Sequence, residues 1–129
     1  YRETTRALTV CVEPEYLERE SQPSRGRYVW AYHVRIENHG AETVQLISRY
    51  WRITDGAGKV QEVRRQGVIG EQPIVRPGEV FEYTSGTPLS VPGGFMTGSY
   101  EMITEDGSGF EIAIPAFSLD CPDQVTRLN

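Results

Sequence analysis

The stretch RYVWAYHVRIEN, residues 27–38, carries the pattern that decides the fold. Side chains of two kinds alternate along it, and one set is large and mostly apolar: Tyr28, Trp30, Tyr32, Val34 and Ile36. The set between them is mainly polar or small: Ala31, His33, Arg35 and Glu37. Successive side chains of a strand point to opposite faces of a sheet, so this alternation predicts a half-buried β-strand.

The next stretch, TVQLISRYWRIT at residues 43–54, predicts a second strand of the same kind. The turn residues Asn38–Gly40 precede it, and Asn and Gly tolerate positive φ. Its alternation places on one face Ile47, Trp51 and Ile53. The other face would carry Leu46, Tyr50 and Arg52. The Gly-rich segment DGAGK that follows, residues 55–59, predicts a hairpin loop.

Similar short runs continue to the end of the chain and predict an all-β fold. Further strands are expected at residues 7–13, Val60–Val63, Val80–Ser85, Phe95–Glu105, Phe110–Ile114 and 116–119, which makes seven or eight in all. Only residues 14–21 resemble a helix, and they allow a turn or two at most. Short strands punctuated by Gly and Pro predict one antiparallel β-sandwich or barrel domain over residues 1–129.

The alternating runs also predict the core of the protein. Its expected members are Trp30, Tyr32, Val34, Ile36, Ile47, Trp51, Phe81, Tyr83, Phe110, Ile112 and Ile114. Trp30 and Trp51 could instead be exposed anchors for a partner, because aromatic residues are enriched at interface hot spots. Their position in alternating runs favours the core.

Composition narrows the class of protein. The 129 residues are 38% hydrophobic and 24% charged, which is typical of a soluble globular domain. No apolar stretch approaches the roughly 20 residues that span a bilayer, and the start of the chain lacks a signal-peptide pattern. We therefore expect a cytoplasmic protein with no membrane partner. The net charge of −5 and the pI near 5.0 argue against a nucleic-acid partner.

Two cysteines, Cys11 and Cys121, lie near opposite ends of the chain. They could pair if the first and last strands are neighbours. Two cysteines in a chain without a leader sequence are more often free thiols.

Residues capable of catalysis or metal binding are few and scattered. The two histidines, His33 and His39, fall on the polar face of a strand and in a turn, and there is no G-x-S-x-G elbow. Glu79 and Glu82 lie beside a strand and are expected to be solvated. No C-x-x-C, H-x-H or H-E-x-x-H spacing predicts a zinc site. We expect no catalytic site, no metal site and no cofactor.

The stretch RRQGVIGEQP, residues 64–73, raises the question of a phosphate loop. A P-loop needs Lys after its last glycine, but Glu71 follows Gly70. A dinucleotide-binding loop needs a helix after it, and Pro73 and Pro77 prevent a regular helix there. The stretch therefore predicts a turn between strands, although Arg64 and Arg65 could still attract an anion.

Five blocks of sequence together resemble the ApaG family. They are RYVWAYHVRIENHG, VQLISRYWRITDGAGKVQEV, GVIGEQPIVRPGEVFEYTSG, GSYEMITEDG and FEIAIPAF, and the resemblance covers roughly residues 8–119. It implies an immunoglobulin- or fibronectin-III-like β-sandwich. It also implies an association with cobalt and magnesium tolerance or efflux, and a gene-neighbourhood link to diadenosine tetraphosphate hydrolysis. The family brings no established catalytic residues, and its eukaryotic copies imply a protein-interaction module.

The family often shows G-x-G-x-x-G where this chain has Arg65 in place of the first glycine. That departure weakens the interpretation of residues 65–70 as a pyrophosphate site. Two other readings remain beside an interaction module. One is a protein that binds a polyphosphate nucleotide or pyrophosphate through the loop Gly67–Gly70. The other is direct binding of cobalt or magnesium through Glu105 and Asp106.

We favour a non-catalytic interaction module that binds an unidentified protein partner through the excursion 64–73. Its apolar centre would be Val68 and Ile69, and its polar rim would be Arg64, Arg65, Glu71 and Gln72, between the flexible Gly67 and Gly70. Alternatively, the two apolar side chains fold back to cap the open end of the core. Edge strands also leave a strand-to-strand homodimer open.

Overall fold

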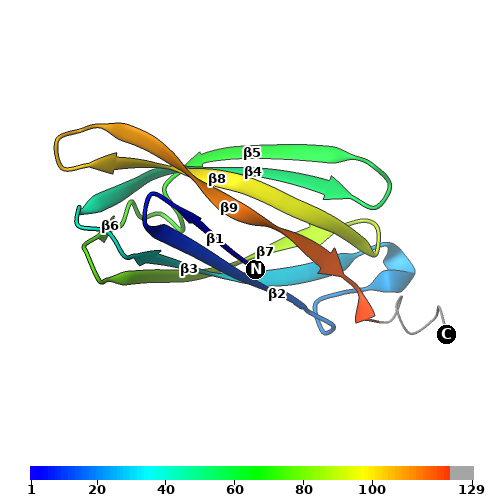
Figure 1. Ribbon diagram of the computed structural model, residues 1–129. Helices are drawn as coiled ribbons and strands as arrows, with labels where there is room; N and C mark the ends of the chain where they lie inside the picture. Colours follow the sequence, from blue (N-terminus) through cyan, green and yellow to red (C-terminus); the bar gives the residue numbers. More distant parts are fainter. Residues whose placement is uncertain (123–129) are drawn as a thin grey trace.

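The computed structural model describes residues 1–122, and it shows two antiparallel sheets stacked face to face (Figure 1). The first sheet has the order β1-β2-β3-β7, with β1 at Arg2–Thr5, β2 at Leu8–Tyr16, β3 at Tyr28–Asn38 and β7 at Val80–Leu89. The second has the order β5-β4-β8-β9, with β4 at Val44–Asp55, β5 at Val60–Gln66, β8 at Gly93–Thr104 and β9 at Gly109–Asp120. The short strand β6, Ile74–Val75, also pairs with β4. The predicted β-sandwich is confirmed; residues 123–129 of the predicted domain lie outside the described residues.

The set of strands differs from the prediction in three places, and several predicted strands are longer than expected. Strand β1 was not predicted, because it joins β2 through Arg6 and Ala7, whose positive φ values of 48° and 64° have no Gly or Asn signal in the sequence. Strand β6 has two residues and was also missed. The two strands predicted at the end of the chain form the single strand β9, in which a register shift opposite Met96–Gly98 accommodates Pro115. Residues 14–21 contain no helix, and the 3-10 turn η1 lies at Pro23–Arg25.

Most of the predicted core lies buried between the sheets: Trp30, Tyr32, Val34, Ile36, Trp51, Tyr83, Ile112 and Ile114. Phe81 and Phe110 are partly buried and pack against it. The prediction was wrong for Ile47, which is half-buried, whereas Leu46 is fully buried. A β-bulge between Leu46 and Ser48 adds one residue to β4, and one extra residue inverts the alternation of faces.

The two long sides of the sandwich differ. On one side β9 contacts both β1 and β2, and the hydroxyls of Tyr1 and Ser118 lie 2.8 Å apart in a hydrogen bond across the sheets. On the other side the edge strands are β5 and β7, and among the described elements no comparable contact joins them. The sandwich is therefore closed along β1 and β9 and open between β5 and β7.

Residues 1–122 contain no disulfide bond. The thiols of Cys11 and Cys121 are free. No helix in this part of the chain has the length and apolar character needed to cross a membrane.

Candidate functional site at the open side of the sandwich

The glycine-containing stretch after β5 forms a tight turn, as its prolines predicted. The N–H of Val68 donates to the carbonyl of Glu71 at 2.8 Å, and the N–H of Glu71 donates back at 2.9 Å. Its two central residues, Ile69 and Gly70, have φ values of 48° and 74°. Two consecutive left-handed residues define the hairpin turn of type I′.

The predicted excursion begins later than residue 64. Arg64 and Arg65 belong to β5, where they pair with Tyr50 and Arg49 of β4, so the irregular segment starts at Gly67. The prediction of a poorly paired Arg64–Gln66 was wrong because the β4–β5 ladder extends three residues beyond Val63. The guanidinium of Arg64 stacks on the ring of Tyr50, 4.2 Å from its centroid, on the outer face of the sheet.

The two apolar residues of the turn differ in solvent exposure. Val68 is completely buried in the core, whereas Ile69 is 61% exposed. Val68 therefore caps the core, as one alternative predicted, whereas Ile69 is exposed, as the other predicted. Glu71 and Gln72 are exposed, as are Arg64 and Arg65 in β5.

The bulge in β4 anchors this turn. The carbonyl of Ile47 accepts a hydrogen bond from the N–H of Gly67 at 2.8 Å and another from Nε2 of Gln72 at 2.9 Å. Arg49 Nη1 donates to the carbonyl of Gly67 at 2.5 Å. Gly67 has φ of 65°, and a Cβ built on it would overlap the carbonyl oxygen of Glu71. The turn can therefore close only with glycine at position 67.

Beside the turn lies a cleft of about 470 Å³ between β5 and β7, called here the inter-sheet cleft. Its apolar lining includes Trp51, Ile53, Val63, Val68, Ile69 and Met96. Its polar lining is Tyr32, Arg49, Gln61, Tyr83, Ser85 and Thr87. An apolar cavity of this size with a few converging polar groups is typical of a binding site.

Tyrosine hydroxyls form the polar part of the cleft. Burial raises the pKa of Tyr32 and of Tyr83, and it raises the pKa of Tyr100 behind them far above its usual range. The hydroxyls of Tyr83 and Tyr100 are joined by a hydrogen bond. The hydroxyls of Tyr32 and Tyr83, which line the cleft, therefore stay protonated at neutral pH.

Trp51 forms part of the cleft wall and has an unusual feature. It is 3% exposed and packs edge-on against Tyr32, with ring centroids 5.2 Å apart. Its indole Nε1 is buried and has no hydrogen-bond partner among residues 1–122. The other tryptophan, Trp30, donates from Nε1 to the carbonyl of Asp120 at 2.9 Å. A buried donor without a partner costs about 1–3 kcal/mol.

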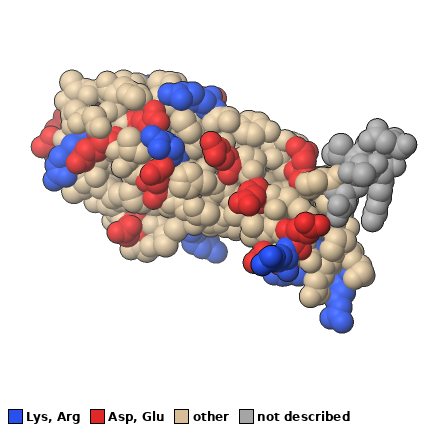
Figure 2. Space-filling view, turned by 90° about the horizontal axis from the view of Figure 1, so that it is seen from below, with Lys and Arg blue, Asp and Glu red and all other residues tan. Residues whose placement is uncertain are grey.

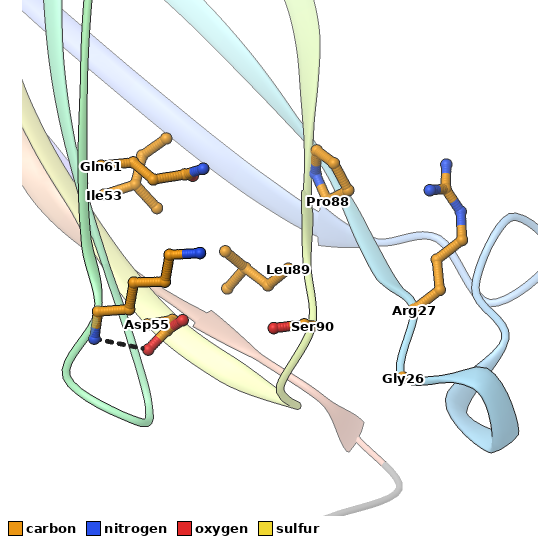
Figure 3. A pocket seen from close by; sticks show the side chains of 9 residues that line it. Gly26, Arg27, Ile53, Asp55, Gln61, Pro88, Leu89 and Ser90 are labelled. Atoms are coloured by element: carbon orange, nitrogen blue, oxygen red, sulfur yellow. Dashed lines mark hydrogen bonds between the residues drawn. The ribbon is translucent and has the colours of Figure 1, made fainter.

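The cleft continues into a second hollow of about 310 Å³, called here the hairpin hollow (Figure 3). Ile53, Gln61 and Pro88 line both. Figure 3 shows Asp55, Gln61 and Ile53 on one wall of the hollow, with Pro88, Ser90 and Arg27 on the other. Together the two hollows form one groove along the open side of the sandwich, with Ile69 near one end and Arg27 near the other.

The remaining candidate groups lie on the outer face of the first sheet, away from the cleft. His33 Nε2 lies 3.2 Å from Glu82 Oε1, and His39 Nε2 lies 2.9 Å from Glu37 Oε1. These histidines, with Arg35, lower the pKa of both carboxyl groups. Acidic and basic side chains are interspersed over this side of the molecule (Figure 2). The predicted solvated character of Glu82 and of His33 fits this exposed network.

Glu105 and Asp106, the alternative considered for direct metal binding, lie in the β8–β9 hairpin. Asp106 accepts hydrogen bonds from the N–H of Ser108 at 3.0 Å and from the hydroxyl of Thr104, so it closes the turn. Within the described chain no group of three or more His, Cys, Asp or Glu side chains could hold a metal ion.

These two hydrogen bonds lower the pKa of Asp106 to about 2. A lowered pKa stabilises the fold above the unfolded-state pKa of about 3.9, and this contribution disappears as the pH falls through the folded-state value. We expect an NMR titration of the Asp106 carboxyl carbon to give a midpoint near pH 2. A midpoint near 4 would show that the carboxylate does not close the turn.

Comparison with known proteins identifies the family of the chain. Residues 18–104 match the family model of the ApaG domain. The chain is 63% identical over 129 residues to Protein ApaG of Rhodospirillum centenum, covering 100% of this chain and 99% of the relative. The chain belongs to the ApaG family. Protein ApaG of Parvibaculum lavamentivorans is 62% identical over the same coverage.

Solved structures of similar proteins share the fold. A protein described as ApaA from Bordetella pertussis has a TM-score of 0.87 at 53% identity, over 89% of this chain and 94% of its own. A structural-genomics target has a TM-score of 0.86 at 39% identity, over 94% and 92%. The C-terminal domain of Wzt, at 11% identity and a TM-score of 0.56, has a similar fold only.

Reasoning from sequence missed three groups of the candidate site: Arg49, the indole N–H of Trp51 and the hydroxyl of Tyr32. The bulge that exchanges the faces of β4 lies between Leu46 and Ser48, and the sequence carried no glycine or proline signal for it.

Proposed function

We propose that this member of the ApaG family is a non-catalytic, cytoplasmic protein-binding module whose partner docks at the open side of the sandwich, over Ile69 and the inter-sheet cleft. The observation that carries the proposal is the conformation of Ile69. It is a β-branched residue with φ of 48°, it is 61% exposed, and it borders the cleft. Left-handed backbone costs a residue with a Cβ about 1–2 kcal/mol, so Asn or Gly would suit this turn better.

A partner contact explains why an exposed isoleucine occupies this position. The turn holds the apolar side chain rigidly on a sandwich, as recognition loops do. Exposed polar residues, among them Glu71 and Gln72, surround it, which gives an apolar centre with a polar rim. The non-catalytic part of the proposal is supported by the position of His33 and His39 on the outer face, away from the cleft.

Ile69→Asn separates stability from binding. We expect the free energy of unfolding of this variant to be about 1 kcal/mol higher than that of wild type, because Asn adopts the left-handed conformation more readily. We also expect it to lose a partner that immobilised wild-type chain captures from the cytoplasm of its own bacterium. Chemical denaturation and quantitative mass spectrometry of the captured protein measure the two effects.

Ile74→Asn is the matched control, since Ile74 is 50% exposed and lies outside the cleft lining. It should keep the partner. Capture that survives Ile69→Asn but fails with Ile74→Asn would move the interface to β6.

A second candidate function is binding of a polyphosphate nucleotide or pyrophosphate. Three arginines favour it, because Arg49, Arg64 and Arg65 contribute to the lining of one hollow of about 330 Å³ beside β4 and β5. Glu101 and Glu111 line the same hollow and oppose an anion. Three amides of the glycine turn, those of Gly67, Val68 and Glu71, already donate to backbone carbonyls. We therefore place this function second.

The association of the family with cobalt and magnesium tolerance would, in our proposal, run through the protein partner. We expect the melting temperature to stay unchanged with millimolar Mg²⁺, Co²⁺, ATP, diadenosine tetraphosphate or pyrophosphate, because a ligand of the native state must stabilise it. A rise with pyrophosphate that Arg64→Ala/Arg65→Ala abolishes would establish the second candidate instead. A saturable rise with either cation would establish direct metal binding.

A further inference from the structure

The groove along the open side has a shape that suits an extended peptide. Its two parts, the inter-sheet cleft and the hairpin hollow, share Ile53, Gln61 and Pro88 in their linings. Its long walls are the edge strands of the two sheets, β5 and β7, and no further strand of the described chain pairs with the outer edge of either. An edge strand presents unpaired backbone groups, with which an extended peptide can pair.

Strand β5 is the better of the two edges for such pairing. It is seven residues long and contains no proline. Strand β7 carries Pro88, which lines both parts of the groove and has no N–H to donate. We therefore expect a bound segment to pair with β5 over about seven residues.

The charges of the groove indicate the chemistry of that segment. No acidic residue lines the inter-sheet cleft, although the whole chain has a net charge of −5. Arg49 lies at one end of the groove, and Arg27 and Lys59 lie at the other. None of these three side chains forms a salt bridge within residues 1–122. The one carboxylate in either lining, Asp55, accepts hydrogen bonds from the N–H groups of Ala57 and Lys59 at 2.9 Å.

The middle of the groove fits an apolar side chain. Its walls there include Ile53, Val63 and Met96. Trp51 also lines the cleft and is 3% exposed, and its indole Nε1 is buried from solvent. A ligand in the cleft would lie against the Trp51 side chain, which lines it.

We propose that the groove binds an extended segment of the partner protein in which acidic residues flank a short apolar centre. This inference rests on the proposed function, since it names the part of the partner that would enter the cleft. The apolar centre would fill the inter-sheet cleft beside Ile69. The acidic flanks would pair with Arg49 at one end and with Arg27 and Lys59 at the other.

The test uses the full chain and the seven-residue probe acetyl-EELFVEE-amide. The protein has two tryptophans, so a proton–nitrogen NMR spectrum shows two indole N–H signals, which Trp51→Phe assigns. We expect EELFVEE to shift the Trp51 signal in a saturable way, because the Trp51 side chain lines the cleft. The Trp30 signal should stay in place, because its Nε1 already donates to Asp120. The probe KKLFVKK, with the same centre and opposite charge, should leave both signals unchanged.

Two variants test the charged ends. Arg49→Gln should weaken EELFVEE about tenfold or more, since it removes a charge-assisted contact. Arg27→Gln/Lys59→Gln should also weaken it, and this pair of exposed side chains keeps the proposal testable if Arg49→Gln loosens the turn. Equal binding of KKLFVKK, or an unmoved Trp51 signal, would overturn the inference. Phenylacetate that produced the same shift with the same affinity would overturn it too, in favour of a small-molecule acid site.

The peptide test of the groove and the capture test of the Ile69 interface can fail independently of each other. Loss of the captured partner with Ile69→Asn, together with a silent Trp51 signal, would leave the binding module in place and refute the acidic segment. Capture unaffected by Ile69→Asn, together with EELFVEE binding, would support the groove and refute the Ile69 interface.

Discussion

Leu46→Ala is expected to lower the free energy of unfolding by about 3 kcal/mol, within the roughly 2–5 kcal/mol typical of a fully buried leucine. Leu46 has no solvent exposure and lies in β4, a strand that pairs with β5, β6 and β8. Truncation there removes apolar contacts on which both sheets depend and leaves a cavity that the flanking strands cannot fill. Urea denaturation followed by tryptophan fluorescence measures the change.

Ile47→Ala is the control that makes this measurement informative. The two residues are neighbours with side chains of equal size, but Ile47 is only half-buried because the bulge turns it away from the core. We expect its truncation to cost about 1 kcal/mol or less. The reverse ranking would mean that the alternation runs unbroken through β4 and that no bulge anchors the turn.

Gly67→Ala should be the most damaging single substitution in the candidate site, with a loss of about 3 kcal/mol in unfolding free energy. The left-handed backbone at φ of 65° alone costs about 1–2 kcal/mol. The added Cβ would also overlap the carbonyl oxygen of Glu71, a backbone atom that cannot rotate away. The turn must then open, which would also displace Ile69 and weaken capture of the partner.

Gly70→Ala provides the matched control in the same turn. Its φ is 74°, but a Cβ there meets no atom within 4 Å. Only the backbone cost remains, so we expect a loss of about 1 kcal/mol. Thermal and urea unfolding of the two variants, compared with wild type, measure the difference. Equal losses would show that the close approach to Glu71 does not constrain the turn.

The alternation of residues 28–36 was sufficient to place β3, because the period of two depends only on neighbouring residues and on burial of one face. The same rule failed at Ile47, where one extra residue in the strand exchanged the two faces. The rule also predicted two strands on either side of Pro115 where the structure has the single strand β9. The strand accommodates the proline through a register shift, so in the sequence it looks like two strands. Strand β1 had no turn signal, because Arg6 and Ala7 adopt positive φ.

In the candidate site, too, some features could be predicted from the sequence and others could not. The glycines and prolines of residues 67–77 predicted a turn, since each of these residues restricts its own backbone. The choice between buried and exposed could not be made for Val68 and Ile69, because it depends on where the turn lies against the core. Arg64 and Arg65 were assigned to the excursion because the length of the ladder with β4 is a property of the partner strand.

The sequence by itself therefore determined the β-sandwich, the family and the position of the turn after β5, because these follow from local alternation, residue type and similarity of motifs. Only the tertiary structure decided that the sandwich is open between β5 and β7, and that Ile69 borders the resulting groove. It alone decided that Trp51 Nε1 is a buried donor without a partner, whereas Trp30 Nε1 has one. The reason is physical: burial, hydrogen-bond satisfaction and the pairing of charges depend on segments distant in the chain that the fold brings together.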